Sequence, residues 1–210
     1  LFDNGYTVLN EKFPLEEIDF LNKYLNYDNY NFVVDGKKID LADLKKIYSI
    51  LDNIGVISIL KRYLGSKIYC YDNSIKTLGK LKCNDSSWQP HHDSKGRRIK
   101  IYIWLNEKNL NTHPLYYFKK THKNIINWSK YADTRFPNIE TDKFDKIYGQ
   151  KGSIIIFDTH GIHSHFKEST IPRSVIELTF ESCGFFNRLN KNNIDQEILR
   201  LNLIKLNQLI

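Results

Sequence analysis

Apolar residues recur at helical spacing in the first third of the chain. The segment that begins at Pro14 places its leucines and isoleucines near one helix face and has two acids in its first turn. A longer segment, 40–64, has the same periodicity, which Gly55 interrupts. Gly65 follows its last apolar residue, where helices commonly end on glycine. The pattern therefore predicts helices between residues 14 and 64.

The pattern changes after residue 65 to short runs of Ile, Val, Tyr and Phe that are separated by turn residues. Such runs are typical of β-strands. The polar stretch 124–146, with scattered aromatic residues, is predicted to form a helix and loops inserted between strands. The predicted strands are 66–71, 98–105, 114–118, 153–157 and 174–181.

The end of the chain returns to helical spacing. Ile194, Ile198, Leu201 and Ile204 recur as on one face of an amphipathic helix, which is predicted over about 194–208. Two interpretations of this apolar face stay open. It packs on the flank of its own domain, or it forms a homodimer contact or a junction to a flanking domain.

Helices followed by many short strands favour an antiparallel double-sheet core with a helical flank. The predicted fold class is mainly β with flanking helices (α+β), built on a jelly-roll core of the double-stranded β-helix, or cupin-like, kind. The mouth of a jelly roll is a common place for a metal. We expect one domain over 1–210, with a helical flank at about 14–64, the jelly-roll core at about 66–184 and the C-terminal helix at about 194–208.

The composition is that of an ordinary globular protein, with 41% hydrophobic and 26% charged residues among 210. No apolar run approaches the ~20 residues that span a bilayer, and Leu1 to Gly5 lack the features of a signal peptide. Cys70, Cys83 and Cys183 have no CxxC spacing, so we expect free thiols in a reducing compartment. These observations predict a cytoplasmic protein without a membrane partner. Because the chain has no methionine, we also expect it to be a piece of a longer protein.

The formal charge of +7 is distributed in short pairs such as Lys45-Lys46 and Lys119-Lys120. Such pairs are typical of a solvated surface. The alternative is that they favour an anionic small-molecule substrate. The chain has no recognisable nucleic-acid-binding motif, so we expect no nucleic-acid partner.

Two distant segments contain metal-ligand side chains. His91 and Asp93 are two residues apart, so on an extended segment both point to one side and His92 points to the other. The second segment, 157–165, offers three histidines, and spacing alone does not select among them. Two histidines and one carboxylate are the ligands of non-haem Fe(II) centres that keep coordination positions open. Each histidine also has a purely structural interpretation.

An arginine follows the second histidine segment and opens the last predicted strand. This residue, Arg173, has a planar guanidinium that can hold a carboxylate in two parallel hydrogen bonds. A 2-oxo acid that chelates a metal at one end presents such a carboxylate at the other. The two histidine segments and the arginine together therefore indicate a metal site that binds a 2-oxo acid.

Four segments are spread over almost the whole chain: the opening FDNGYTVL with LEEI (2–18), WQPHHD (88–93), LNE through HPL to KTHK (105–123) and GSIIIFDTHGIH (152–163). Together they resemble the phytanoyl-CoA dioxygenase (PhyH-like) family of Fe(II)- and 2-oxoglutarate-dependent oxygenases. The third segment departs from the family's usual Asn-Gly-Pro-Leu and Gly-Ser-His pattern at Thr112, His113 and Lys120-Thr121.

The resemblance implies specific roles for five residues. It implies His91, Asp93 and His163 as iron ligands, Arg173 as the anchor of 2-oxoglutarate and Tyr102 as an aromatic neighbour of the cosubstrate. The intact carboxylate argues against the family's halogenase variants. The nucleic-acid demethylase relatives carry a second arginine shortly after the anchor, and this chain has none until residue 188.

The resemblance also implies an activity. The expected enzyme uses molecular oxygen to hydroxylate an unactivated C–H bond of a small molecule or biosynthetic intermediate, and it releases succinate and CO2. Desaturation and cyclisation use the same ligands and stay open. Lys95, Arg97, Arg98 and Lys119 either recognise an acidic substrate at the mouth or form solvated surface.

Two other functions are compatible with the same residues. One is a zinc or iron hydrolase, a metal-dependent enzyme that does not use 2-oxoglutarate and has no need of Arg173. The other is a non-catalytic jelly-roll binding module of a larger biosynthetic protein. Turnover of 2-oxoglutarate separates both from the oxygenase.

Overall fold

The computed structural model describes residues 1–25, 33–78, 89–93, 98–105, 114–123, 134–136, 138–165 and 173–182. The predicted C-terminal helix, Cys83 and Cys183 lie outside these ranges. The helical elements are η1 (Leu15–Glu17), η2 (Asp19–Tyr24), α1 (Leu41–Asn53), α2 (Val56–Leu64), η4 (Thr121–Lys123) and η5 (Thr141–Lys143). The strands are β1 (Tyr6–Lys12), β2 (Val33–Lys38), β3 (Ile68–Leu78), β4 (His91–His92), β5 (Arg98–Trp104), β6 (Leu115–Tyr117), β7 (Thr134–Arg135), β8 (Asp145–Ile147), β9 (Ser153–Asp158), β10 (His163–Ser164) and β11 (Arg173–Ser182).

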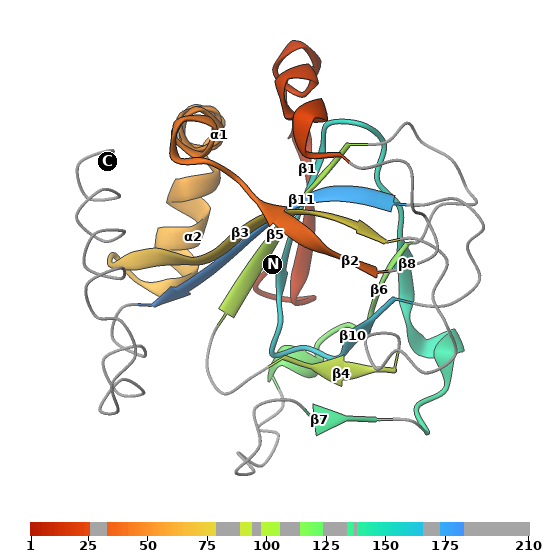
Figure 1. Cartoon of the computed structure of the whole chain (residues 1–210). Helices are drawn as coiled ribbons and strands as arrows, with labels where there is room; N and C mark the ends of the chain where they lie inside the picture. Colours follow the sequence, from red (N-terminus) through yellow and green to blue (C-terminus); the bar gives the residue numbers. More distant parts are fainter. Residues whose placement is uncertain are drawn as a thin grey trace, which may run out of the picture.

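Two antiparallel sheets form the core (Figure 1). The larger has the strand order β1-β9-β5-β11-β3-β2, and the smaller has the order β7-β4-β10-β6-β8. Neighbouring strands in both sheets are far apart in sequence, as in a jelly roll. A layer of apolar side chains from both sheets, including Tyr102, Tyr117 and Phe157, packs between them. The predicted fold class, mainly β with flanking helices, is confirmed.

Side chains of β5 alternate between the two faces of the larger sheet. Ile99, Ile101 and Ile103 pack in the core cluster that includes α1 and α2. The intervening Tyr102 and Trp104 pack in the layer between the sheets. Because β5 is buried on both faces, its sequence is apolar almost throughout and does not alternate with polar residues.

Helices α1 and α2 cover the face of the larger sheet that is turned away from the smaller sheet (Figure 1). The Asp40 side chain caps α1 by accepting a hydrogen bond from the Asp43 amide at 2.9 Å. Gly55 separates the helices with a φ of 80°, and Gly65 is the C-cap of α2, both as predicted. No helix in the described part of the chain is long and apolar enough to cross a membrane.

Three predictions of secondary structure differ from the elements that the described residues form. The helix predicted after Pro14 is a pair of 3-10 turns, η1 and η2. β2 lies inside the predicted helical flank, where it pairs with β3. Within 124–146, the described residues form β7, β8 and η5. In each strand the pairing partner is distant in sequence, so tertiary hydrogen bonding outweighs local propensity.

The packing of α2 predicts a large loss of stability for one substitution. Leu60 is fully buried between α2 and the larger sheet. Leu60→Ala leaves a cavity there, and we expect the free energy of unfolding in urea to fall by about 2–5 kcal/mol. Ser58 is exposed on the same helix, so Ser58→Ala is expected to leave the free energy of unfolding within about 0.5 kcal/mol of the parent. Equal losses in the two variants would contradict this packing.

Candidate metal centre

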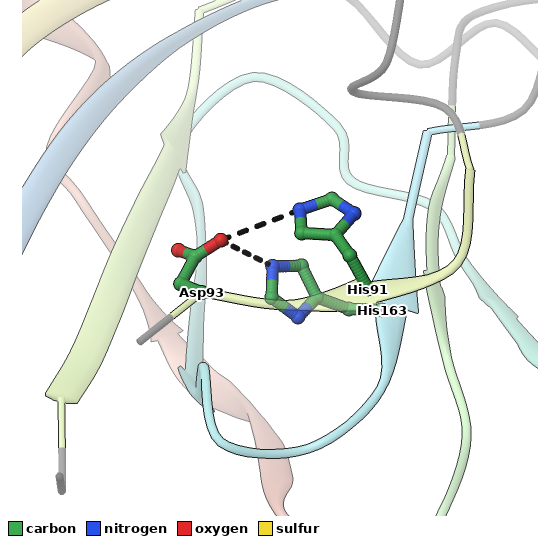
Figure 2. Close-up of side chains that lie close together, drawn as sticks. All are labelled: His91, Asp93 and His163. Carbon is green, nitrogen blue, oxygen red and sulfur yellow. Dashed lines mark ion pairs between the residues drawn. The ribbon is translucent and has the colours of Figure 1, made fainter. Parts of the chain in front are cut away.

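Three side chains from two neighbouring strands converge between the sheets. His91 lies on β4, Asp93 follows that strand directly, and His163 begins β10, where it pairs directly opposite His91. Figure 2 shows the carboxylate facing both imidazole rings. Each residue offers a ligand atom, and these atoms all lie within 4.8 Å of one another. The sheet register thus brings together ligand types that are far apart in sequence.

The two imidazole rings are held with the same nitrogen toward the carboxylate. Nε2 of His91 is 3.3 Å and Nε2 of His163 is 3.5 Å from Oδ1 of Asp93. The opposite nitrogen, Nδ1, is 2.7 Å from the Gln89 carbonyl oxygen in His91 and 2.9 Å from the Gly161 carbonyl oxygen in His163. Since a carbonyl only accepts, Nδ1 carries the proton in each ring. Both Nε2 lone pairs are therefore available to a metal.

A tight turn after β9 delivers His163 to this position. Oδ1 of Asp158 accepts a hydrogen bond from the His160 amide at 2.8 Å, and the Asp158 carbonyl accepts one from Gly161 at 3.1 Å. An ideal Cβ on Gly161 would lie 1.8 Å from the Tyr117 hydroxyl, so only glycine fits here. The turn therefore depends on its aspartate and its glycine.

Charges and burial around the triad favour an ionised carboxylate at Asp93 and a neutral imidazole at His91. Burial alone would raise the pKa of Asp93, but the ammonium of Lys100, 2.5 Å from Oδ2, and the neighbouring His163 hold it well below its usual value. Burial and the proximity of His163 lower the pKa of His91. Both effects favour the protonation states in which Asp93 and His91 bind a divalent cation.

The triad lines one end of a cavity of about 210 Å³. Arg173, with no exposed surface, lines it too and places Nη2 3.0 Å from Nδ1 of His165. Its guanidinium lies 5.3 Å from the ring centre of Tyr102 and 5.4 Å from that of Trp104. Burial lowers the pKa of Arg173 to about 10, so the side chain remains a cation at neutral pH. The cavity can hold an anion near a metal.

All five residues that the sequence singles out for the site border this cavity: His91, Asp93, Tyr102, His163 and Arg173. His92 lies elsewhere, with its ring 5.6 Å from that of His160 and 6.0 Å from that of Phe136. The alternation of side chains along β4 explains this separation of neighbouring histidines.

The cavity is also bordered by His165, one of the three histidines of the segment 157–165, and by three charged residues that were not anticipated from the sequence. These three are Lys76, Lys100 and Glu177. A signal for two of them exists in the sequence, because Lys100 and Glu177 each lie between apolar residues in the middle of β5 and β11. Charged residues within buried strands are rare unless they are paired.

Two of the basic residues expected at the mouth have other partners. Arg98 contacts Glu181 through an ion pair, and Lys119 contacts Asp145 at 3.0 Å. The cations of the cavity are instead Lys76, Lys100 and Arg173. Lys95 and Arg97 lie outside the described residues.

No family model matches the chain, and no curated protein is significantly similar to it in sequence. Solved structures are similar in fold. The epimerase SnoN, in complex with Fe3+, alpha ketoglutarate and nogalamycin RO, is 14% identical with a TM-score of 0.61, over 92% of this chain and 89% of SnoN. HygX from Streptomyces hygroscopicus, with nickel and 2-oxoglutarate bound, is 8% identical with a TM-score of 0.59, over 87% and 84% of the chains.

EctD from S. alaskensis, with bound Fe, is 14% identical with a TM-score of 0.53, over 86% of this chain and 73% of EctD. Identities this low establish the architecture and not the chemistry. The chain therefore shares the jelly-roll, cupin-like fold of SnoN, HygX and EctD.

Proposed function

We propose that this chain is an Fe(II)- and 2-oxoglutarate-dependent dioxygenase of the phytanoyl-CoA dioxygenase-like family. One observation carries the proposal. The triad of His91, Asp93 and His163 opens into the same cavity as the buried cation of Arg173. A hydrolytic metal site has no need of a buried arginine, whereas 2-oxoglutarate that chelates a metal at one end presents a second carboxylate that such a cation can bind.

The three ligands fit Fe(II) by their donor set. Two neutral imidazoles and one carboxylate form the facial arrangement that leaves positions open for further ligands. When bound, the metal supplies the oxidative chemistry, in which 2-oxoglutarate and O2 yield succinate, CO2 and one oxygen atom for the substrate. The protein holds the ligands in place through the Gln89 and Gly161 carbonyls.

Arg173 is proposed to bind the carboxylate of 2-oxoglutarate that is distant from the metal. The guanidinium is completely buried, and an anion there meets a cation that water does not screen. The rings of Tyr102 and Trp104 lie against the guanidinium, with their centres 5.3 and 5.4 Å from it, and limit its movement. This preorganisation reduces the entropy that the side chain loses on binding.

The proposed reaction is hydroxylation of an unactivated C–H bond in a small molecule. The cavity contains three cations against the two carboxylates Asp93 and Glu177, which favours an anionic ligand. Molecular oxygen is the proposed co-substrate, and the proposed location is the cytoplasm, where the buried thiol of Cys70 stays reduced.

Turnover of 2-oxoglutarate tests the proposal without knowledge of the substrate. The protein, incubated aerobically with Fe(II), ascorbate and 2-oxoglutarate, is expected to form succinate slowly, since such sites oxidise the cosubstrate even when no substrate is present. His91→Ala is expected to form none above the rate of free Fe(II). Wild-type protein that binds metal and yet forms no succinate would favour the hydrolase or the non-catalytic binding module.

A further inference from the structure

The two oxygens of the Asp93 carboxylate have different partners. Oδ1 faces both imidazoles, at 3.3 Å from His91 and 3.5 Å from His163 (Figure 2). Oδ2 lies 2.5 Å from Nζ of Lys100. One oxygen is thus directed into the metal position, and the other is already bound by a cation.

Lys100 is largely buried, at a position where an apolar residue would pack. Its neighbours at the inward positions of β5 are Tyr102 and Trp104, and only 16% of its own side chain is exposed. Removing an ammonium from water costs several kcal/mol unless strong partners compensate for it. The carboxylate of Asp93 is therefore the partner that accounts for a lysine at this inward position.

A second carboxylate keeps Lys100 in place. Oε1 of Glu177 lies 3.6 Å from Nζ of Lys100 and 2.8 Å from Nζ of Lys76. Asp93, Lys100, Glu177 and Lys76 therefore form a row of alternating charge along the cavity wall. Because Lys76 also pairs with Glu177, loss of Lys100 leaves that glutamate with a partner and leaves Asp93 without its cation.

We propose that Lys100 is a positioning residue of the metal centre, whose ammonium occupies Oδ2 of Asp93 so that the carboxylate binds the metal through Oδ1 alone. A carboxylate can bind a cation through one or both oxygens. Binding through both would fill a position that the cosubstrate needs. The ammonium also repels the metal and so weakens binding of the metal alone. This role rests on the proposed function.

The test measures metal and cosubstrate binding separately by calorimetry, with Mn2+ as a redox-stable substitute for Fe(II). Lys100→Met keeps the length of the side chain and removes its charge. We expect the variant to bind Mn2+ alone about tenfold more tightly, because repulsion is lost and both oxygens of Asp93 become available. We expect its Mn2+ form to bind 2-oxoglutarate about tenfold more weakly, because a coordination position is filled. Lys67→Met, at an exposed site, is the control for loss of one charge. It should match the parent in its affinity for Mn2+ and in the affinity of its Mn2+ form for 2-oxoglutarate.

Lys100→Gln removes the charge and keeps a polar side chain. It should shift the affinities for Mn2+ and for 2-oxoglutarate in the same directions as Lys100→Met does. This second variant provides the test if Lys100→Met does not fold. An unchanged or weaker affinity for Mn2+ in the folded variant would overturn the proposal, as would an unchanged affinity for 2-oxoglutarate. Weaker binding of both ligands would show a merely structural role. Failure of the wild-type protein to bind either ligand would instead contradict the proposed function itself.

Discussion

Replacing His91 with alanine is expected to weaken binding of Fe(II) or Mn2+ by more than about 100-fold, because even an outer partner of a metal ligand contributes about 10–100-fold in affinity. The ring is one of three donors around the site, and its Nε2 is oriented by the hydrogen bond from Nδ1 to Gln89. Without it, Asp93 and His163 provide too few ligands to hold the ion. Calorimetric titration with Mn2+ measures the loss.

The neighbouring histidine provides a matched control. His92 is buried as deeply as His91, yet its ring lies beside His160 and Phe136. His92→Ala is therefore expected to lower the melting temperature and to keep the metal affinity of the parent. Equal loss of metal binding in both variants would mean that the effect comes from disturbed folding of β4 and not from a lost ligand.

Replacing Arg173 with methionine is expected to weaken binding of 2-oxoglutarate to the metal-loaded protein by about 100-fold. A charge-assisted hydrogen bond contributes about 1.5–3 kcal/mol, and the guanidinium fork can form two of them with one carboxylate. Its complete burial beside the rings of Tyr102 and Trp104 leaves the cation unscreened by water. Titration of the Mn2+ form with 2-oxoglutarate measures this loss.

Metal binding in Arg173→Met is expected to stay within about threefold of the parent, because Arg173 contributes no ligand. Arg62, on the exposed side of α2, is the control for a lost positive charge, and Arg62→Met should bind both ligands as the parent does. Retention of 2-oxoglutarate affinity in folded Arg173→Met would assign the cosubstrate's carboxylate to another cation of the cavity, such as Lys76 or Lys100.

The architecture follows from the sequence where the hydrophobic pattern is long or strongly apolar. The helices on either side of Gly55 were predicted from apolar residues at helical spacing, and the buried strands β5, β9 and β11 were predicted because burial on both faces leaves nearly continuous apolar runs. The short strands β4, β7, β8 and β10 have only two or three residues each, too few to establish a period. Their pairing partners determine them, and those partners are remote in sequence.

Residue types and spacing restrict the first pair of candidate ligands, whereas the choice of His163 among three histidines came from the family resemblance. Asp93 and His91 fall on one side of an extended segment, and the structure places His163 directly across from His91. The pairing of Lys100 with Asp93 and Glu177 could not be read from spacing, because it depends on the register between β5 and β11. That register sets Glu177 opposite Tyr102, next to the inward side chain of Lys100.

The most direct test of the central claim is the visible spectrum of the protein reconstituted anaerobically with Fe(II) and 2-oxoglutarate. Chelation of the metal by the 2-oxo acid produces a weak charge-transfer band, which hydrolytic zinc sites and metal-free binding modules do not form. We expect this band in the parent, its loss in His91→Ala and a higher concentration of 2-oxoglutarate for half-saturation in Arg173→Met. Its absence in well-folded wild-type protein, or its persistence unchanged in both variants, would contradict the assignment.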